Sequence, residues 1–450
     1  MRLNLASTVA LALALTTAHG TAIAQVRTPV SEAKTMQSLS LDERDAVLDA
    51  IKAAFRKSYV FPEKTPAIIA KLDHAKAAGR YNVTNPNELA GLITSDLRDA
   101  SQDGHAFLQY DPQRYAAATL SPADSTGQDL VGFDAAAARR DHHGLTELRV
   151  LAGNIRYLKI AGFAWVSDET GQAYDDAMRF LKGGDAVIID LRGNGGGWPE
   201  AVQYLVSHFL KAGTLEITFH QAGQDPVQTR VLDNLPAGRM IGKPLYVLID
   251  QASASAAESF AYDVQQFKLG KLVGAATAGA ANNNEFVPIA PGFMLSVSVG
   301  RPVHPVSKTN WEGAGVAPDV PVAPAHALDH AHALALRMLL EEHLPPEIRA
   351  DYAWALPEAE ARLNPVTVPA TTVQAAGGSY GQYVVTTEKG DLWIARPGHP
   401  LWPAPRRMRP LKAEGLFAVD GIAILRIGVK PDALELWWKD EAAPRILKRN

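Results

Sequence analysis

Three serines lie where an apolar run gives way to a helical pattern, in PLYVLIDQASASAAESFAYDV at 244–264. Ser255 follows an expected strand at 245–249 and directly precedes a helix expected over 256–267. A serine at a helix N-terminus faces unpaired backbone N–H groups and the positive end of the helix dipole, which stabilise negative charge on oxygen. The position favours a nucleophile, although the same spacing also suits an N-cap serine.

A glycine-rich turn, DLRGNGGGWPE at 190–200, follows another expected strand. Consecutive glycines allow positive φ and a close approach to a ligand, so their N–H groups can point at a carbonyl oxygen. An oxyanion hole is one use of such a turn, and a bland turn is another. A phosphate loop is disfavoured because no Gly-Lys-Ser/Thr or G-x-G-x-x-G pattern is present. Asp190 and Arg192 are expected to hold the turn by an ion pair or hydrogen bonds.

Two further motifs complete a recognisable set, TAGAANN at 277–283 and WEGAGVAPDV at 311–320. Together the four motifs resemble the tail-specific and tricorn-type serine peptidases, particularly the branch that lacks a PDZ domain and is similar to the modules of interphotoreceptor retinoid-binding protein. The similar segments run from about 95 to 320. The resemblance implies an α/β fold with a ClpP/crotonase-like catalytic core, and chemistry that needs no metal or organic cofactor.

The resemblance also assigns roles around the serine. It implies that Ser255, in Ser-Ala-Ala-Glu, is the nucleophile and that Ser253 is a structural neighbour. It implies oxyanion donors from Ala256 and from one glycine of the turn, which we place at Gly196 with Gly195 as the alternative register.

The resemblance implies a histidine or a lysine as the general base. In the processing peptidases a lysine follows the serine by 25 positions, but here that position is Ala280. The departure points to the tricorn-like arrangement, in which a histidine accepts the serine proton near neutral pH and an acid supports it. The resemblance implies His105 as this base and Glu312 as the acid. Glu258 is a rival acid, expected instead to make a local structural contact.

The alternative bases are three lysines: Lys268, Lys271 and Lys308. Three other histidines share one helical stretch: His326, His330 and His332. They include an i, i+4 pair that could hold zinc, but Asp329 would face a different side and no third ligand is evident, so a structural interpretation is favoured. His142–His143 is expected to be an exposed loop pair.

The first residues, MRLNLASTVALALALTTAHGTAIAQ, have the pattern of a signal peptide at 1–24 with cleavage near Ala24. Their apolar run is shorter than the roughly 20 residues needed to span a bilayer, so we expect export without an integral membrane anchor, to a periplasm or the extracellular space. The sequence has no cysteine. A cysteine nucleophile is therefore excluded, and stability must come from core packing.

Periodicity divides the remaining chain. A capping box at Ser40–Glu43 precedes three expected helices, and alternating strands and helices later give an α/β core. The expected units are an N-terminal helical domain at 25–111, a connection at 112–145, the catalytic core at 146–340, a linker at 341–369 and a small antiparallel β domain at 370–450. The three helices are expected at 41–57, 65–79 and 87–100.

A net charge of -4 and a pI near 6.4 provide no basic stripe for nucleic acid. We therefore expect an exported serine peptidase that hydrolyses extended polypeptides through a Ser-His-Glu acyl-enzyme mechanism. The alternative is a non-catalytic module that binds an apolar ligand or a peptide on the same scaffold. Acyl-CoA chemistry suits the broader fold but conflicts with export. The oligomeric state stays open.

Overall fold

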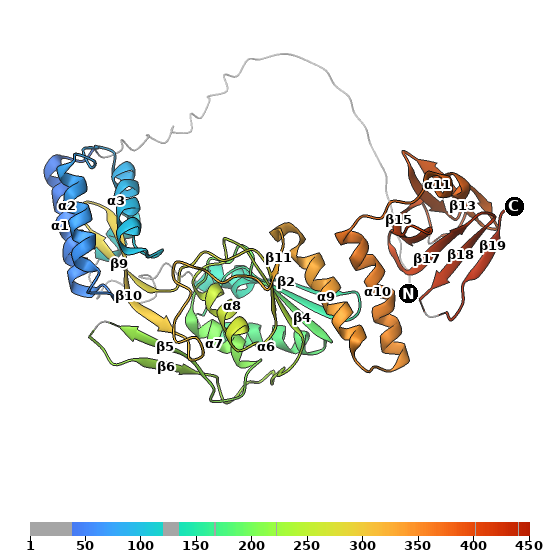
Figure 1. Cartoon of the computed structure of the whole chain (residues 1–450), viewed down its shortest axis with the longest axis horizontal. Helices are drawn as coiled ribbons and strands as arrows, with labels where there is room; N and C mark the ends of the chain where they lie inside the picture. Colours follow the sequence, from blue (N-terminus) through green and yellow to red (C-terminus); the bar gives the residue numbers. More distant parts are fainter. Residues whose placement is uncertain (1–37, 120–134, 166–167, 222, 401, 440) are drawn as a thin grey trace, which may run out of the picture. The chain divides into compact units, whose positions relative to one another are not determined.

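The computed structural model describes residues 38–119, 135–165, 168–221, 223–400, 402–439 and 441–450 (Figure 1). The expected signal peptide and part of the expected connection lie outside these residues. Among the helices that the structure describes, none is both long and apolar enough to cross a membrane.

Three N-terminal helices confirm the expected helical unit: α1 Leu41–Ser58, α2 Thr65–Ala77 and α3 Pro86–Ser101. The capping box before α1 is present, because Glu43 N donates to Ser40 Oγ at 3.2 Å and Ser40 N donates to Glu43 Oε2 at 2.8 Å. The helices share one hydrophobic core with three later strands, which lie beside them in Figure 1, so residues far apart in sequence bury one another here.

Those strands belong to a five-stranded antiparallel sheet with the order β1-β10-β5-β6, in which β9 also pairs with β10. Its strands are β1 Phe107–Tyr110, β5 Leu215–Gln221, β6 Val227–Arg230, β9 Asn283–Ile289 and β10 Phe293–Val303. The pairing of Phe107 with Ser296 brings the segment before β1 against the middle of β10.

A second sheet has the order β11-β8-β7-β4-β3-β2 and is parallel except for β2. Its strands are β2 Leu145–Leu151, β3 Ile155–Ile160, β4 Ala186–Asp190, β7 Leu245–Ile249, β8 Lys271–Gly274 and β11 Val320–Pro321. Because β4 and β7 are parallel neighbours, the turn after β4 and the serine after β7 meet at one edge of the sheet, where α/β folds bind ligands.

Helices cover both faces of this sheet. The core on one face includes α6 Asp168–Lys182, α7 Pro199–Ser207 and α8 Ala256–Gln266, and the core on the other face includes α9 Ala327–Glu341. Alternate residues of β4 enter the two cores, Val187 the first and Ile188 the second. The expected α/β core is therefore confirmed as a layered structure.

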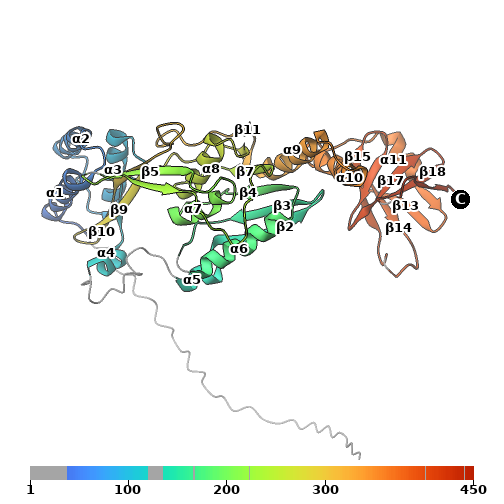
Figure 2. The same ribbon diagram turned by 90° about the horizontal axis from the view of Figure 1, so that it is seen from below.

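The short helices α4 Pro112–Thr119, α5 Ala135–Arg140, η2 His142–Gly144 and η3 Pro324–His326 connect these layers. The stretch at 341–369, expected to be a linker, instead contains α10 Pro346–Leu363, which lies beside α9 in Figure 2. Its prolines suggested an irregular segment, and Pro357 does lie inside the helix. Burial of Tyr352, Ala355 and Ala359 at helical spacing nevertheless stabilises α10.

The C-terminal residues confirm the expected antiparallel β structure. After α11 Ala370–Ala376, eight strands pair in sequence order around their own hydrophobic core. They are β12 Gly378–Tyr380, β13 Tyr383–Glu388, β14 Asp391–Ala395, β15 Arg406–Lys412, β16 Leu416–Val419, β17 Ile422–Lys430, β18 Ala433–Trp438 and β19 Arg445–Lys448.

Candidate active site

Ser255 lies just beyond β7 and is the N-cap residue of α8, with φ 54° and ψ −118°. A non-glycine residue in a sparsely populated backbone region costs on the order of 1–3 kcal/mol, and such residues cluster at functional sites. The backbone N–H of Ser255 donates to Glu258 Oε2 at 2.9 Å. This bond holds the strained turn at the start of the helix.

The glycine turn contacts this serine directly. A Cβ built on Gly196, whose φ is +103°, would lie 2.8 Å from both Ala254 O and Ser255 Cβ and 3.0 Å from Ala256 N. Only a residue without a side chain fits there, so the two expected oxyanion residues, Gly196 and Ala256, are neighbours. The N–H of Gly196 donates to Asn194 Oδ1 at 2.8 Å in this structure, so Asn194 must release it before it can bind an oxyanion.

Asp190 and Arg192 form the expected ion pair, with Arg192 Nη2 at 2.5 Å from Asp190 Oδ2. Arg192 also donates through its backbone N and Nε to Asp190 Oδ1, at 3.0 and 2.9 Å. Burial of Asp190 would raise its pKa, but the hydrogen bonds and charge of Arg192 lower the pKa overall. The pair therefore stays ionised and fixes the first residues of the turn.

Ser253 has no exposed surface, and its hydroxyl donates to Leu191 O at 2.8 Å. It also accepts the N–H of Asp250 at 3.1 Å. These contacts tie the segment after β7 to the segment after β4, which is the structural role expected of Ser253.

Glu258 makes the local structural contact expected of it, and it also bonds residues that lie far from it in the sequence. Its fully buried carboxylate accepts Ser255 N at 2.9 Å, Thr277 Oγ1 at 2.6 Å, Gly279 N at 2.6 Å and Ala280 N at 2.8 Å. Glu258 thus links the serine turn to the loop at 277–282.

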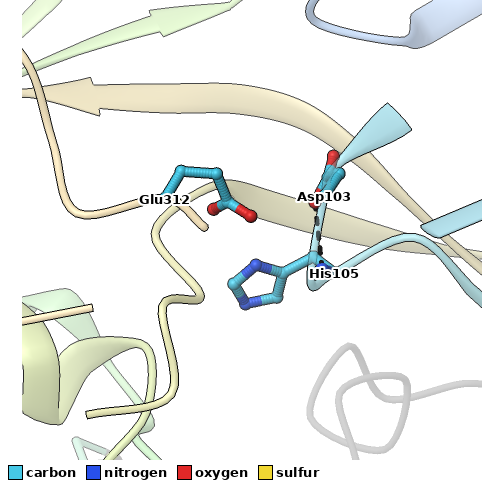
Figure 3. A group of neighbouring side chains, drawn as sticks. All are labelled: Asp103, His105 and Glu312. Atoms are coloured by element: carbon cyan, nitrogen blue, oxygen red, sulfur yellow. Dashed lines mark hydrogen bonds between the residues drawn. The ribbon is translucent and has the colours of Figure 1, made fainter. Parts of the chain in front are cut away.

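His105 lies in the loop before β1, beside two carboxylates. Ligand atoms of Asp103, His105 and Glu312 all lie within 4.8 Å of one another, and Figure 3 shows the imidazole ring reaching toward the side of Glu312. The structure therefore brings together the expected base and the expected acid, which are 207 positions apart in the sequence.

Glu312 is held by backbone N–H groups from two segments. Gly104 N donates to Oε1 at 2.9 Å, and Ala281 N and Asn282 N donate to Oε2 at 2.6 and 2.9 Å. Burial raises the pKa of Glu312, and these three N–H groups oppose the rise. The carboxylate is oriented before any substrate binds.

Asp103 is a site residue that sequence reasoning missed. Its Oδ1 accepts the backbone N–H of His105 at 2.9 Å, marked by the dashed line in Figure 3, and its Oδ2 accepts the hydroxyl of Tyr59 at 3.2 Å. The signal was present in Asp-Gly-His, because an aspartate often accepts the N–H two residues later in a turn. Asp103 and Tyr59, which directly follows α1, fix the histidine loop.

The environment of His105 suits proton transfer. Burial lowers its pKa, and the charge of Asp103 partly opposes this effect. The imidazole is therefore neutral at neutral pH and able to accept a proton. The Nδ1 of His105 is buried and has no hydrogen-bond partner among the described residues, while the backbone carbonyl of His105 accepts Ser296 Oγ at 2.5 Å.

The loop at 277–282 joins the two halves of the site. The N–H groups of Gly279 and Ala280 donate to Glu258, and those of the next two residues donate to Glu312. A Cβ built on Gly104 would lie 3.6 Å from Ala280 Cβ. Ala280, which occupies the position of the lysine in the processing peptidases, therefore borders the loop that carries His105. Within the described residues, Ser255 and His105 share no hydrogen bond.

Two other histidine predictions have clear outcomes. His332 is buried between Ala152 O, 2.8 Å from its Nε2, and Arg362 Nη2, 2.9 Å from its Nδ1, which confirms its structural interpretation. The prediction that His142 and His143 are both exposed is wrong for His143. His143 is buried and its Nδ1 lies 3.0 Å from Thr170 Oγ1, because a turn of positive φ carries its ring toward α6.

Comparison with known proteins adds an independent observation. The segment 154–322, which contains Ser255, Gly196 and Glu312, matches the model of peptidase family S41. We call residues 154–322, which match this family model, the S41 segment. His105 lies before this S41 segment, so its role depends on the geometry above.

Curated relatives of the S41 segment include the carboxy-terminal processing protease CtpB of Bacillus subtilis, 25% identical over 180 residues. Carboxyl-terminal-processing peptidase 2 of Arabidopsis thaliana, a chloroplastic protein, is 27% identical over 178 residues. Each alignment covers 39% of this chain, and 36% and 33% of the two relatives. The chain thus spans about a third of the length of these relatives.

Solved structures that resemble the chain include the photosystem II D1 C-terminal processing protease, with a TM-score of 0.42 and 16% identity. That match covers 62% of this chain and 93% of the other. The tricorn protease matches with a TM-score of 0.41 and 13% identity, over 66% of this chain and 37% of the other.

Proposed function

We propose that this protein is a serine peptidase in which Ser255 is the nucleophile, His105 the general base and Glu312 its supporting acid. The observation that carries the proposal is the loop at 277–282, whose consecutive N–H groups bond two glutamates. One is Glu258, which accepts the N–H of Ser255, and the other is Glu312, which lies beside His105. One loop thereby fixes the two halves relative to each other.

The proposed reaction follows from these positions. Ser255 Oγ attacks the carbonyl carbon of the peptide bond while neutral His105 accepts its proton. The Glu312 carboxylate stabilises the imidazolium that forms. The backbone N–H of Ala256, together with the turn at Gly196, stabilises the oxyanion. His105 then donates its proton to the leaving amine, and water hydrolyses the acyl-enzyme by the same proton transfers in reverse.

One rearrangement is required. Among the described residues, His105 shares no hydrogen bond with Ser255, and its Nδ1 bonds neither Glu312 nor another group, so the three side chains must come together when substrate binds. Catalytic hydrogen bonds are often long or absent without substrate and form in the Michaelis complex. Release of Gly196 N–H from Asn194 would belong to the same change.

The substrate and location are further parts of the proposal. S41 membership of the central segment supports a polypeptide substrate, cleaved internally or near its carboxyl end. The N-terminal sequence pattern supports export before the peptidase acts.

Covalent labelling tests the nucleophile. A fluorophosphonate probe should label the wild-type protein, and Ser255→Ala should abolish labelling with little change in Tm. Ser259→Ala, one turn later in the same helix, is the matched control and should label normally. Equal labelling of Ser255→Ala and wild type would contradict the proposal, and absence of labelling in the wild type would favour a binding module on this scaffold.

A further inference from the structure

A pocket of about 630 Å³ adjoins the candidate base, with Glu312 and Asp103 in its wall. Its other charged or titratable lining residues are Lys64, His220, Arg301 and Lys308. They come from separate segments, the start of α2, β5, β10 and the loop after β10. The fold thus collects two lysines and an arginine beside the site.

Within the described residues, Lys64, Arg301 and Lys308 form no ion pair, although ion pairs are frequent elsewhere in the chain. Lys64 Nζ donates to Ser101 O at 3.0 Å and lies 4.8 Å from the ring centre of Phe61, and the Arg301 guanidinium lies 5.5 Å from the same ring. Phe61 therefore positions two of the cations at the pocket.

The two acids of the wall do not neutralise this charge directly. Glu312 accepts three backbone N–H groups, and Asp103 accepts the N–H of His105 and the hydroxyl of Tyr59. Both carboxylates are committed to the candidate base and its loop. The cations are left to bind an anion from outside.

Asn282 provides an independent indication of a ligand. Its side chain lines the same pocket and is only 2% exposed, yet neither its Nδ2 nor its Oδ1 has a hydrogen-bond partner in the described chain. Leaving a buried amide unpaired costs free energy, so such groups are retained where something else pairs with them. Its backbone N–H is already bound to Glu312, which fixes its position.

We propose that this pocket binds a carboxylate of the peptide substrate, from an acidic side chain or from the chain terminus, through Arg301, Lys308, Lys64 and Asn282. A carboxylate has only acceptor oxygens, which match ammonium, guanidinium and amide N–H donors. The inference rests on the proposed peptidase function and adds to it a charge preference set by residues outside the Ser-His-Glu group.

Matched peptides test the preference and separate its two sources. Quenched fluorescent peptides of one sequence carry Glu or Gln at a scanned position, with a free or amidated terminus. The wild type should cleave one carboxylate form about tenfold faster in kcat/KM than its neutral partner, which is the scale of one charge-assisted hydrogen bond. Because Arg301 and Lys308 are exposed, the ratio should fall as salt rises.

Variants locate the preference in the pocket. Arg301→Gln and Lys308→Gln should each reduce the carboxylate ratio to about threefold or less. Lys271→Gln removes an exposed lysine outside the pocket and should leave the ratio unchanged. Equal ratios in Lys308→Gln and Lys271→Gln would overturn the assignment of the pocket.

Asn282→Leu distinguishes a ligand-binding amide from a structural one. It should keep or raise Tm, because it removes unpaired buried polar atoms, while the carboxylate ratio falls. A Tm loss of several degrees with an unchanged ratio would overturn its role. If the wild type reacts with the fluorophosphonate but prefers neither carboxylate, this inference fails alone. If the probe does not react, the peptidase proposal fails.

Discussion

The serine half and the histidine half of the site are built differently. Ser255 is placed by β7, α8 and the neighbouring turn after β4, all within the S41 segment. His105 precedes that segment, and its loop is held through its two neighbours. Tyr59 bonds Asp103, which accepts the N–H of His105, and Gly104 donates to Glu312, which the loop at 277–282 holds. A local motif can fix a nucleophile, whereas the base depends on contacts between distant parts of the chain.

The largest effect should come from removing the base. His105→Ala should abolish both peptide hydrolysis and fluorophosphonate labelling, because no other group would accept the Ser255 proton. Hydrolysis and labelling rates are the measurements, and exposed His326→Ala is the matched control that should retain both. Full labelling of His105→Ala would show that Ser255 reacts without His105, and would contradict the assignment of His105 as the base.

The next effect concerns the acid. Glu312→Gln keeps the size of the side chain but removes the charge that stabilises imidazolium, and loss of that charge in a comparable triad costs on the order of ten-thousand-fold in kcat. Turnover and Tm should be measured together, with the rate loss far exceeding any loss of stability. Near-normal turnover, combined with an indispensable Lys268, Lys271 or Lys308, would assign the base to a lysine.

A smaller effect should come from the glycine turn. A Cβ at Gly196 would meet Ala254 O and Ser255 Cβ at 2.8 Å, so Gly196→Ala must push the turn away from the serine. We expect kcat to fall by on the order of a hundredfold, as for loss of one oxyanion donor. Gly193 also has positive φ, +77°, but open space at its Cβ. Gly193→Ala therefore controls for backbone strain, and equal losses in both variants would contradict the contact argument.

The smallest expected effect is that of metal chelation. Asp103, His105 and Glu312 are close enough to bind a metal ion together. Their hydrogen bonds are also those expected of a base with two orienting acids, and that role needs no metal. Activity measured before and after treatment with a strong chelator should be unchanged. A loss restored by zinc would assign the group to a metal and remove His105 from the proton-transfer role.

The difference between the halves also explains how far the sequence could be interpreted. Strand, turn and helix patterns predicted the position of Ser255, and its strand and helix match closely. The pairing of β1 with β10 joins residues nearly two hundred positions apart, and no periodicity indicates it. Tertiary contacts also bury Asn282 and bring the Tyr59 hydroxyl to Asp103, so neither feature could be predicted from local sequence. The prolines of the segment 341–369 favoured a linker in the sequence interpretation, so the helix α10 was not predicted there.

The pH dependence of labelling tests the central claim, that a half-buried neutral histidine activates Ser255, most directly. Burial lowers the pKa of His105 from its ordinary value of 6.5, so the base is competent above its pKa and protonated below it. The labelling rate of the wild type should therefore rise with pH through a midpoint below 6.5 and be level above neutrality. A rate that keeps rising well above about pH 7, as expected for a lysine base, would contradict the account.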